Sequence, residues 1–289
     1  MGTAHGPPTY GEREFPFSAK EFRYLASLVY ERSGIVLTAH KQDMVYARLA
    51  RRLRSLGLSS FQQYCELIQS EYGASEVGSL INAITTNLTR FFREIHHFEH
   101  LREVVLKESN LDAAQSGQRR LRIWSAGCSS GEEPYSIAMT LMDGLPGLER
   151  WDARILATDL DTSMVEKAAR GRYPESALDN VPRTLQLRYF ETERSGYDMQ
   201  WTVVSGVRRL ITFKQLNLLG AWPMSGKFDA IFCRNVMIYF DAATKAKLVS
   251  RFAGLLKPRG WLYVGHSESL LDNQSSFELK GRTIYRMVA

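Results

Sequence analysis

The chain has 289 residues, of which 44% are hydrophobic and 24% are charged, and its net charge is +6. This composition is typical of a globular protein, and no apolar run reaches the ~18 residues that a membrane-spanning helix needs. The three cysteines lack paired or metal-type spacing and the N-terminus lacks a signal-peptide pattern, so we expect a cytoplasmic protein without membrane insertion. The positive charge indicates an acidic partner but does not choose among nucleic acid, a membrane surface and an acidic protein.

Apolar residues at helical spacing dominate the first part of the chain. A possible cap at Ser18 and a glycine stop at Gly34 bound the first helix. The predicted helices cover residues 18–34, 41–57, 59–69 and 75–101, and the polar stretch 107–118 predicts a loop. We therefore expect a small all-helical domain over residues 15–88 and a second domain over residues 89–289.

From residue 119 onward, short apolar segments alternate with helical segments. This alternation predicts an α/β domain with a mainly parallel sheet and helices on both faces. The predicted strands cover residues 120–127, 153–159, 210–218, 228–235 and 260–266, with a final strand pair in 277–288.

The connection between the second and third of these strands is unusually long, covering residues 174–209. Connections of this length inside a compact domain are usually insertions with a task of their own. Its segment "YDMQWTVV" has apolar residues at every second position, which predicts antiparallel strands. We therefore expect a small β subdomain inserted in the larger domain.

The stretch "WSAGCSSGEEPYS" places a glycine turn between a strand and a helix, as a nucleotide loop does. Glu132 and Glu133 would repel a phosphate there but attract a positive amine or sulfonium. The next strand ends on Asp159, where an acidic residue commonly binds ribose hydroxyls. A nucleoside with a cationic amino-acid tail fits this pattern, and S-adenosylmethionine is such a ligand. The alternative is that the glycines only permit a turn and the glutamates only favour the helix dipole.

Four segments give the chain a closer likeness: "TTNLTRFFRE", "GEEPYSIA", "NLL" and "FDAIFCRNVMIYF". They resemble the CheR family of bacterial chemotaxis receptor methyltransferases, and the likeness runs from about Ser18 to Met287. The resemblance implies a helical front domain and a Rossmann-like S-adenosylmethionine-dependent methyltransferase domain. It also implies a protein-glutamate O-methyltransferase, which esterifies glutamates on the cytoplasmic helices of chemoreceptors and releases S-adenosylhomocysteine in chemotaxis signal transduction.

The resemblance also implies a set of site residues. Arg93 and Tyr239 would lie in the active site, with Tyr239 beside the transferable methyl group. Glu133 would face the methionine amine and Asp159 the ribose. The implied cofactor-binding residues are Asn87, Thr89, Arg93, Glu133, Asp159, Asn217, Leu218, Asn235 and Val236.

The chemistry is consistent with these residues, because a glutamate carboxylate has a pKa near 4.3 and is already an ionised nucleophile at neutral pH. The reaction needs no general base and no metal. A guanidinium such as that of Arg93 matches either the acceptor carboxylate or the methionine tail, although a purely structural role is an alternative. His96 and His100 lie one helical turn apart, but no third metal ligand is evident, so we expect no metal site.

Two other functions compete with this interpretation. The basic charge suggests a nucleic-acid methyltransferase, but "RNVMIYF" lacks the prolines that shape a slot for a flipped base. A module that only binds S-adenosylmethionine is the second alternative, and the set of Arg93, Asn235 and Tyr239 argues against it. We expect a monomer whose partners are receptor cytoplasmic domains and not nucleic acid.

Two surfaces are candidates for receptor binding. Lys41, Arg48, Arg51 and Arg52 share one face of a predicted helix, which the resemblance suggests docks on acidic receptor helices. In the insertion, the segment with Trp201 and Val203 is a candidate edge strand for a receptor C-terminal peptide. The adjacent turn contains only Gly196, and the alternative is that the insertion merely covers the cofactor site.

Overall fold

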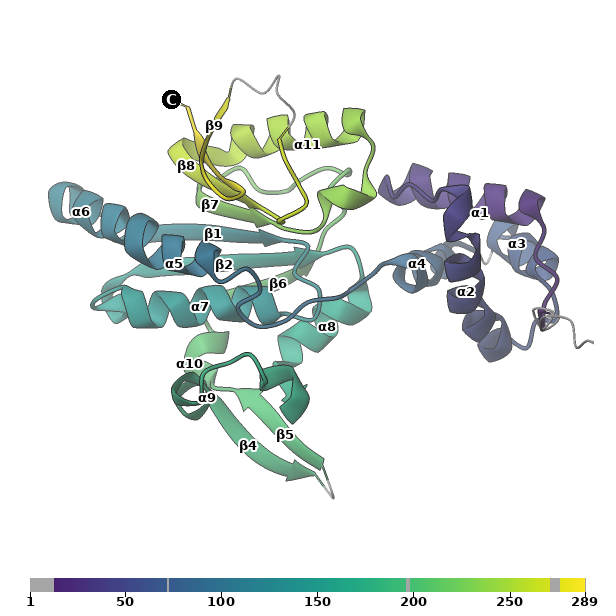
Figure 1. Ribbon diagram of the computed structural model, residues 1–289, viewed down its shortest axis with the longest axis horizontal. Coiled ribbons are helices and arrows are strands. Elements are labelled where there is room, and N and C mark those ends of the chain that lie inside the picture. The colour runs from purple at the N-terminus through teal and green to yellow at the C-terminus, as the bar shows by residue number, and fades with distance from the viewer. Residues whose placement is uncertain (1–12, 72, 196–197, 271–275, 289) are drawn as a thin grey trace, which may run out of the picture. The chain divides into compact units, whose positions relative to one another are not determined.

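The computed structural model describes residues 13–71, 73–195, 198–270 and 276–288. The chain forms two compact units (Figure 1). The helical unit comprises Met1–Arg32 and Val36–Ile84, and the sheet unit comprises Ser33–Ile35 and Thr85–Ala289. Within the described ranges, no helix is long and apolar enough to cross a membrane.

Four α-helices and a short 3-10 turn build the described part of the helical unit. They are α1 (Ala19–Ser33), η1 (Ala39–Lys41), α2 (Gln42–Leu56), α3 (Phe61–Gln69) and α4 (Gly73–Ile84). The apolar face of α2 is fully buried at Val45, Leu49 and Leu53, as its helical spacing predicts. Gly57 ends α2 with a φ of 69°, a left-handed conformation that glycine adopts without strain.

The predicted helix over 75–101 is two helices in the structure, and its middle is not helical. Helix α4 ends at Ile84 and α5 begins at His96 (His96–His100), so the eleven residues 85–95 form an irregular connection. The threonines and asparagine of "TTNLT" explain the break, because β-branched side chains and asparagine favour helices poorly. This connection carries three of the predicted site residues.

The predicted loop over 107–118 is wrong. Helix α5 continues through a π-helical turn, η2 (Leu101–Val105), into α6 (Leu106–Ser116). Leu106 and Ala113 bury one side of α6, and Gly117 ends it with a φ of 73°. Leucine, alanine and glutamine are good helix formers, so a polar composition did not indicate a loop here.

Among the described residues, seven strands form the main sheet, in the spatial order β6-β2-β1-β7-β8-β10-β9. They are β1 (Arg120–Ala126), β2 (Asp152–Asp159), β6 (Ile211–Gln215), β7 (Phe228–Cys233), β8 (Leu256–Val264), β9 (Phe277–Gly281) and β10 (Ile284–Met287). Strands β6, β2, β1, β7 and β8 pair with one another in parallel. Strand β10 pairs antiparallel with β8 and with β9. The predicted mainly parallel sheet is therefore confirmed.

Helices cover both faces of this sheet, namely α7 (Glu132–Gly144), α8 (Thr162–Arg170) and α11 (Ala242–Leu255). Alternate residues of β1 point to opposite sides, as in any strand. Ile123 joins the core cluster that contains α7, whereas the Trp124 ring contacts the Phe252 ring of α11 at 5.4 Å between centroids. The strand order reverses beside β1, and ligands of such sheets bind at the carboxyl ends of the strands at this point.

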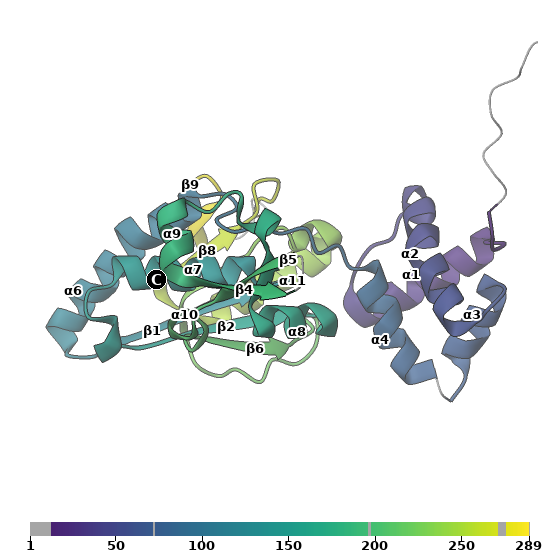
Figure 2. The same cartoon turned by 90° about the horizontal axis from the view of Figure 1, so that it is seen from below.

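The insertion forms a separate antiparallel sheet with the order β3-β5-β4, so the prediction of extra antiparallel strands is confirmed (Figures 1 and 2). Its elements are β3 (Arg172–Pro174), η4 (Glu175–Leu178), α9 (Arg183–Tyr189), β4 (Phe190–Ser195), β5 (Asp198–Val203) and α10 (Ser205–Arg208). The segment proposed as an edge, with buried Trp201 and Val203, is the central strand β5. That prediction is wrong, because β5 is paired on both sides. Gly196 lies outside the described residues.

Candidate active site

The glycine loop after β1 is held tightly between β2 and the end of β7. The Gly127 N–H donates to the Thr158 carbonyl at 2.8 Å, and Gly127 has a φ of 93°. A Cβ atom at this glycine would lie 2.3 Å from Cγ2 of Val236, so a larger residue does not fit. Glycine is therefore needed here for conformation and for the close approach of Val236.

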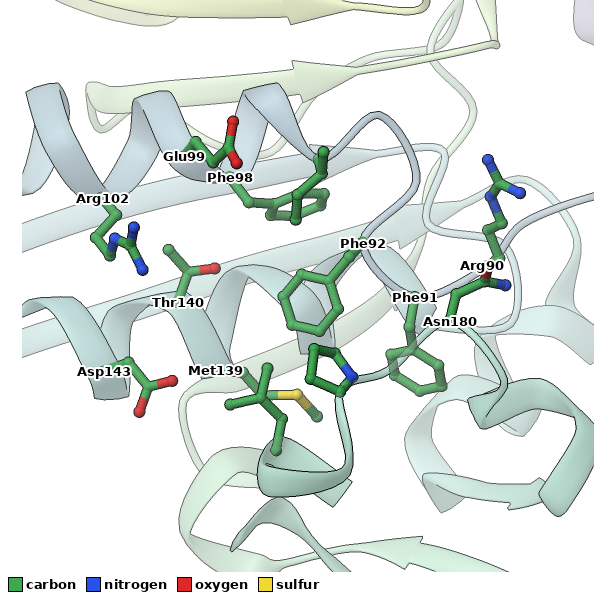
Figure 3. Close-up of a pocket in the computed structure, with 13 residues that line it drawn as sticks. Arg90, Phe91, Phe92, Phe98, Glu99, Arg102, Met139, Thr140, Asp143 and Asn180 are labelled. Carbon is green, nitrogen blue, oxygen red and sulfur yellow. The ribbon is translucent and has the colours of Figure 1, made fainter. Parts of the chain in front are cut away.

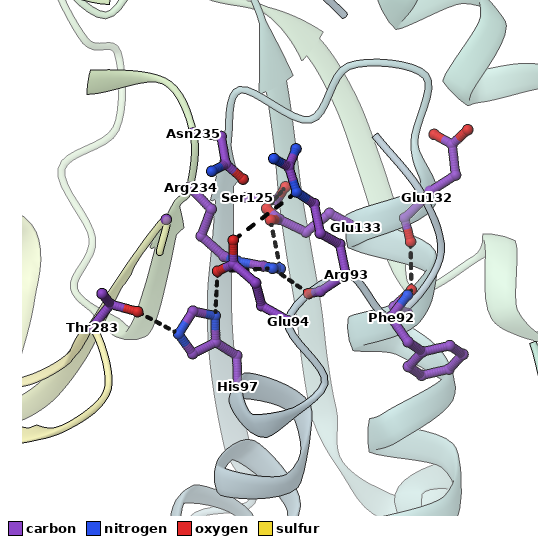
Figure 4. Close-up of polar contacts among 12 residues, drawn as sticks. Phe92, Arg93, Glu94, His97, Ser125, Glu132, Glu133, Arg234, Asn235 and Thr283 are labelled. Carbon is purple, nitrogen blue, oxygen red and sulfur yellow. Dashed lines mark hydrogen bonds and ion pairs between the residues drawn. The ribbon is translucent and has the colours of Figure 1, made fainter. Parts of the chain in front are cut away.

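The two glutamates that follow the loop point in different directions. The Glu133 carboxylate accepts a hydrogen bond from the Ser125 hydroxyl at 2.7 Å and pairs with Arg234 at 3.1 Å (Figure 4). The Glu132 carboxylate instead accepts from the Ser130 hydroxyl at 2.7 Å. Burial raises the pKa of Glu133, and the nearby Arg234 charge opposes that rise. Only Glu133 therefore belongs to the charged cluster beside the loop.

Asp159 is buried at the end of β2, in direct contact with the loop. One carboxylate oxygen accepts the Ser129 N–H at 2.7 Å and the other accepts the Asp161 N–H at 2.9 Å. Burial raises the pKa of Asp159, and these two backbone bonds oppose the rise. A carboxylate has about four acceptor positions, so the Asp159 side chain retains capacity for hydroxyl groups of a ligand.

The connection after α4 is tied to the same loop through Asn87. The Asn87 carbonyl accepts from the Ser129 hydroxyl at 3.0 Å, and its side-chain amide donates to Asp161 at 2.9 Å. Asn87 and Asp159 thus share Ser129 as a partner, although 72 positions separate them in the chain. Thr89 lies in the same connection and is half-buried.

The side chains of Arg93, which lies within this connection, and of Tyr239, which lies after β7, both hydrogen-bond to the backbone of the connection. An Arg93 guanidinium nitrogen donates to the Leu88 carbonyl at 2.9 Å, and the Tyr239 hydroxyl donates to the Thr86 carbonyl at 3.4 Å. In Figure 4 the Arg93 side chain is directed toward Glu133 and Asn235, whereas the Phe92 ring is directed away. The two residues predicted for the active site therefore border the same short segment.

The remaining predicted cofactor residues lie in the loops after β6 and β7. The Asn217 side chain accepts the Leu219 N–H at 2.9 Å, which fixes a turn, and Leu218 is buried. Asn235 has a φ of 59°, and its N–H donates to the Glu268 carboxylate at 2.8 Å. Both loops start at carboxyl ends of parallel strands, where the glycine loop and Asp159 also lie.

Arg234 and Glu94 belong to this site, and the sequence reasoning missed both. The Arg234 side chain is 2% exposed, and it contacts Glu133 at 3.1 Å and Glu94 at 3.4 Å. Burying a charge is costly unless it is paired. An arginine inside the otherwise apolar run "DAIFCRNVMIYF" was therefore the signal that an acidic partner exists.

This cluster fits a cationic ligand group. Two carboxylates, of Glu94 and Glu133, surround one buried guanidinium, and the half-buried Arg93 lies 4.0 Å from Glu94. The Oε2 atom of Glu94 is buried and has no hydrogen-bond partner among the described residues. Carboxylates beside the glycine loop suit the positive amine of an amino-acid tail better than a phosphate.

The histidines of "HHFEH" hold α5 against the C-terminal strands. His96 hydrogen-bonds with the Arg282 carbonyl at 3.1 Å, His97 with the Thr283 hydroxyl at 3.0 Å, and His100 with the Tyr263 hydroxyl at 2.9 Å. Burial lowers the pKa of His97 to about 2 and that of His100 to about 4, so both are neutral. In the described ranges, no group of three or more His, Cys, Asp or Glu side chains has metal-binding geometry.

A separate pocket of about 380 Å³ lies beside this site (Figure 3). Its apolar wall includes Phe92, Phe98, Met139 and Leu185. None of the predicted catalytic or cofactor residues lines it, and it is bounded by α5, α7 and the insertion instead. The pocket is therefore distinct from the loop cluster where the predicted residues meet.

The predicted basic face lies in the helical unit, where most of its members have partners. Arg52 forms a two-pronged ion pair with Glu76 at 2.9 and 2.6 Å, and Arg48 donates to the Ile84 carbonyl at 2.5 Å. The Lys41 ammonium donates to the Val36 carbonyl at 3.4 Å. Arg51 is the exposed member of the four.

Comparisons with known proteins cover nearly the whole chain. A family model described as "CheR methyltransferase, SAM binding domain" matches residues 87–286, and one described as "CheR methyltransferase, all-alpha domain" matches residues 20–85. The predicted cofactor, S-adenosylmethionine, and the predicted succession of an all-helical and a methyltransferase domain are thereby confirmed.

Curated relatives are similar over comparable lengths. The chain is 47% identical over 260 residues to the "Probable chemotaxis protein methyltransferase" of Rhizobium etli, with 90% of this chain and 96% of the relative covered. It is 46% identical over 275 residues to the "Chemotaxis protein methyltransferase" of Escherichia coli, with 93% and 91% covered. It is 40% identical over 286 residues to the "Chemotaxis protein methyltransferase 2" of Pseudomonas aeruginosa, with 99% of each covered.

Proposed function

The chain belongs to the CheR methyltransferase family, and we propose that it esterifies glutamate side chains on the cytoplasmic helices of chemoreceptors. The reaction would form glutamate methyl esters in chemotaxis adaptation, with S-adenosylmethionine as methyl donor. S-adenosylmethionine supplies an electrophilic methyl group on a sulfonium centre. The observation that carries the proposal is the meeting of Glu133, Asp159, Arg93 and Tyr239 around the loops at the carboxyl ends of the parallel strands.

The roles of the cofactor-binding residues follow from their contacts. Glu133 would bind the amine of the methionine tail, since its carboxylate lies beside the glycine loop and is held there by Ser125 and Arg234. Asp159 would accept the ribose hydroxyls with its remaining acceptor positions. The loops that carry Asn217 and Leu218, and Asn235 and Val236, would enclose the rest of the nucleoside.

Arg93 and Tyr239 would handle the acceptor. A glutamate carboxylate is ionised at neutral pH, so the protein has only to hold it in line and exclude water. Arg93 would hold the acceptor carboxylate by a charge-assisted hydrogen bond, and Tyr239 would orient it. Arg93 lies in the same connection as Asn87 and Thr89, and Tyr239 hydrogen-bonds to it, so this one segment would contact both the cofactor and the acceptor.

Receptor recognition would use surfaces outside this site. The exposed Arg51 is suited to contact acidic receptor helices, whereas Lys41, Arg48 and Arg52 would contribute their positive field from half-buried positions. A receptor C-terminal peptide would add to an outer strand of the insertion, β4 or β3, because β5 is central. We propose that the enzyme acts as a monomer.

The test is a methyl-transfer assay with purified receptor cytoplasmic domains from the same organism and radiolabelled S-adenosylmethionine. Label that alkali releases as methanol identifies carboxyl methyl esters, and receptors with the modified glutamates changed to glutamine are the control. Parallel reactions with DNA and RNA test the nucleic-acid alternative. Adenosylhomocysteine binding without label on any receptor domain would overturn the proposal and favour a module that only binds the cofactor.

A further inference from the structure

Arg234 connects three segments of the site through one buried side chain. It pairs with Glu133 at the start of α7 and with Glu94 in the connection, and it donates a hydrogen bond to the Arg93 carbonyl (Figure 4). Its guanidinium also lies 5.4 Å from the centre of the Phe98 ring in α5. The side chain is 2% exposed, so these protein groups, and not water, pair with its charge, and its buried Nε atom has no hydrogen-bond partner among the described residues.

The segment that Arg234 holds has an unusual backbone. Phe92 and Glu94, which flank Arg93, have φ values of 51° and 58°. Non-glycine residues adopt this left-handed conformation rarely, and they keep it only where surrounding contacts enforce it. Those contacts include the Ser136 hydroxyl, which accepts the Phe92 N–H at 2.9 Å, and the His266 N–H, which donates to Glu94 at 3.2 Å. Arg234 supplies the contact to the middle residue of the turn.

The charges of the cluster are unbalanced without Arg234. Glu133 accepts hydrogen bonds from Ser125 and Arg234, and one oxygen of Glu94 has no hydrogen-bond partner among the described residues. Removing the guanidinium would leave two nearby carboxylates in a buried site, where like charges favour uptake of a proton. A protonated Glu133 would no longer attract a cationic amine.

We infer that Arg234 is a positioning residue, which orients Glu133 toward the amine of the cofactor and fixes the turn that aims Arg93. This inference rests on the proposed placement of the cofactor amine at Glu133. One side chain thereby links the group that binds the amino-acid tail to the group that would hold the acceptor. The arrangement predicts that loss of Arg234 selectively harms ligands that carry the amino-acid tail.

The experiment compares two ligands by calorimetry: S-adenosylhomocysteine, which has the amino-acid tail, and 5′-methylthioadenosine, which lacks it. In Arg234→Met, affinity for adenosylhomocysteine should fall by about 10- to 100-fold, the loss expected for charge-assisted hydrogen bonds. Affinity for methylthioadenosine should change by less than about twofold. Arg234→Lys keeps the charge but not the fork, so it should give an intermediate loss of adenosylhomocysteine affinity.

Arg286 offers a matched control. Its guanidinium also pairs with a carboxylate, that of Glu108, at 2.9 Å, and it lies 4.6 Å from the centre of the Trp261 ring. Neither Glu108 nor Trp261 is a proposed site residue. Arg286→Met should leave the affinity ratio of the two ligands unchanged. Binding of methylthioadenosine also reports that each variant is folded.

A second variant keeps the inference testable if Arg234→Met does not fold. Glu94→Gln weakens the ion pair by which the turn holds Arg234, without removing Arg234 itself, so it should weaken adenosylhomocysteine several-fold while methylthioadenosine is unaffected. Equal weakening of both ligands in the Arg234 variants, or no weakening of either, would overturn the inference. Because no receptor is present, failure here is distinct from failure of glutamate methylation, which the receptor assay measures.

Discussion

Each unit of the chain contains a cluster of arginine and glutamate, and the two clusters differ in how fully their charges are paired. In the helical unit, Glu76 accepts two bonds from Arg52 and one from the Tyr64 hydroxyl at 2.8 Å. In the sheet unit, Arg234 faces two carboxylates, and one oxygen of Glu94 has no hydrogen-bond partner among the described residues. The hydrogen bonds of the first cluster are complete within the protein, whereas the second cluster retains a buried carboxylate oxygen without a hydrogen bond.

The backbone around the two clusters differs in the same way. Arg52 and Glu76 project from regular helices, α2 and α4. Glu94 lies in a turn with two residues of positive φ, outside any regular element. Strain of this kind costs of order 1–3 kcal/mol per residue and occurs where function requires a fixed geometry. Complete pairing on regular helices therefore indicates a structural cluster, and incomplete pairing beside a strained turn indicates a functional one.

The largest loss of methyl-transfer activity should come from removing the Arg93 side chain, which lies in the strained turn. Arg93→Ala should lower methyl transfer to receptor glutamates by about 100- to 1,000-fold, as for other groups that hold developing or reacting charge. Tyr239→Phe should cost about tenfold, since it removes one neutral hydrogen bond. Initial rates at saturating cofactor measure both, with thermal unfolding as control. Full activity in both variants would refute this active-site placement.

A substitution in the cluster of Arg52, Tyr64 and Glu76 should lower the stability of the protein and leave ligand binding unchanged. Glu76→Gln should lower the free energy of unfolding by about 1–2 kcal/mol, because Arg52 and Tyr64 lose an ionised acceptor. The value is modest because the Arg52 side chain is 34% exposed, so water can replace part of the interaction. Urea unfolding measures the change, and adenosylhomocysteine affinity should be unaltered. A large loss of affinity would mean that the helical cluster is not merely structural.

A substitution of Asp159 tests whether its carboxylate accepts hydrogen bonds from the ribose of the ligand. Asp159→Ala should weaken both adenosylhomocysteine and methylthioadenosine by more than about tenfold, because both ligands carry the ribose. The result would separate Asp159 from Glu133, whose loss should affect only the ligand with an amine. Calorimetry with unchanged affinities would exclude the ribose assignment.

Much of this architecture could be predicted from the sequence, because its signals are local. The strand–helix alternation, the glycine loop and Asp159 at a strand end depend on a few adjacent residues each. The predicted loop over 107–118 and the predicted continuous helix over 75–101 were wrong, because composition and periodicity alone could not separate helix from loop.

Contacts between distant segments could not be predicted in this way. Arg234 and Glu133 are 101 positions apart, and no local pattern joins them. The alternation in "YDMQWTVV" correctly indicates a strand, but a strand's place in its sheet depends on pairing partners elsewhere in the chain. The site residues that the sequence did not reveal, Arg234 and Glu94, are therefore those brought together by ion pairs between distant segments.

The charge of Glu133 should make cofactor affinity depend on pH. Binding of the cationic amine needs the ionised carboxylate, and burial raises the pKa of Glu133 above its ordinary value of 4.5. Affinity for adenosylhomocysteine should therefore fall several-fold as the pH is lowered through this raised pKa.

The affinity for methylthioadenosine should depend less on pH, and Glu133→Gln should reduce the pH dependence of adenosylhomocysteine affinity. His97 does not contribute, since its pKa of about 2 keeps it neutral. Parallel profiles for both ligands would argue against an amine at Glu133.

The smallest effect concerns the basic face of α2, and the comparison of clusters decides which residue tests it. Reversing Arg52 would also break the pair with Glu76, so a loss of activity would not report on receptor docking. Arg51 is exposed, and Arg51→Glu should raise the apparent KM for receptor about two- to fivefold with little change in stability, as expected for a screened surface charge.

The salt dependence of that effect identifies its origin. If Arg51 attracts acidic receptor helices, raising the salt concentration should narrow the difference in KM between Arg51→Glu and the unaltered enzyme, because salt screens exposed charges. Arg54→Glu is a matched control on the same helix, since Arg54 is also exposed but pairs with Glu14 at 2.8 Å. Equal effects of both substitutions would indicate attraction by net charge alone, and an unchanged KM in Arg51→Glu would remove this residue from the receptor surface.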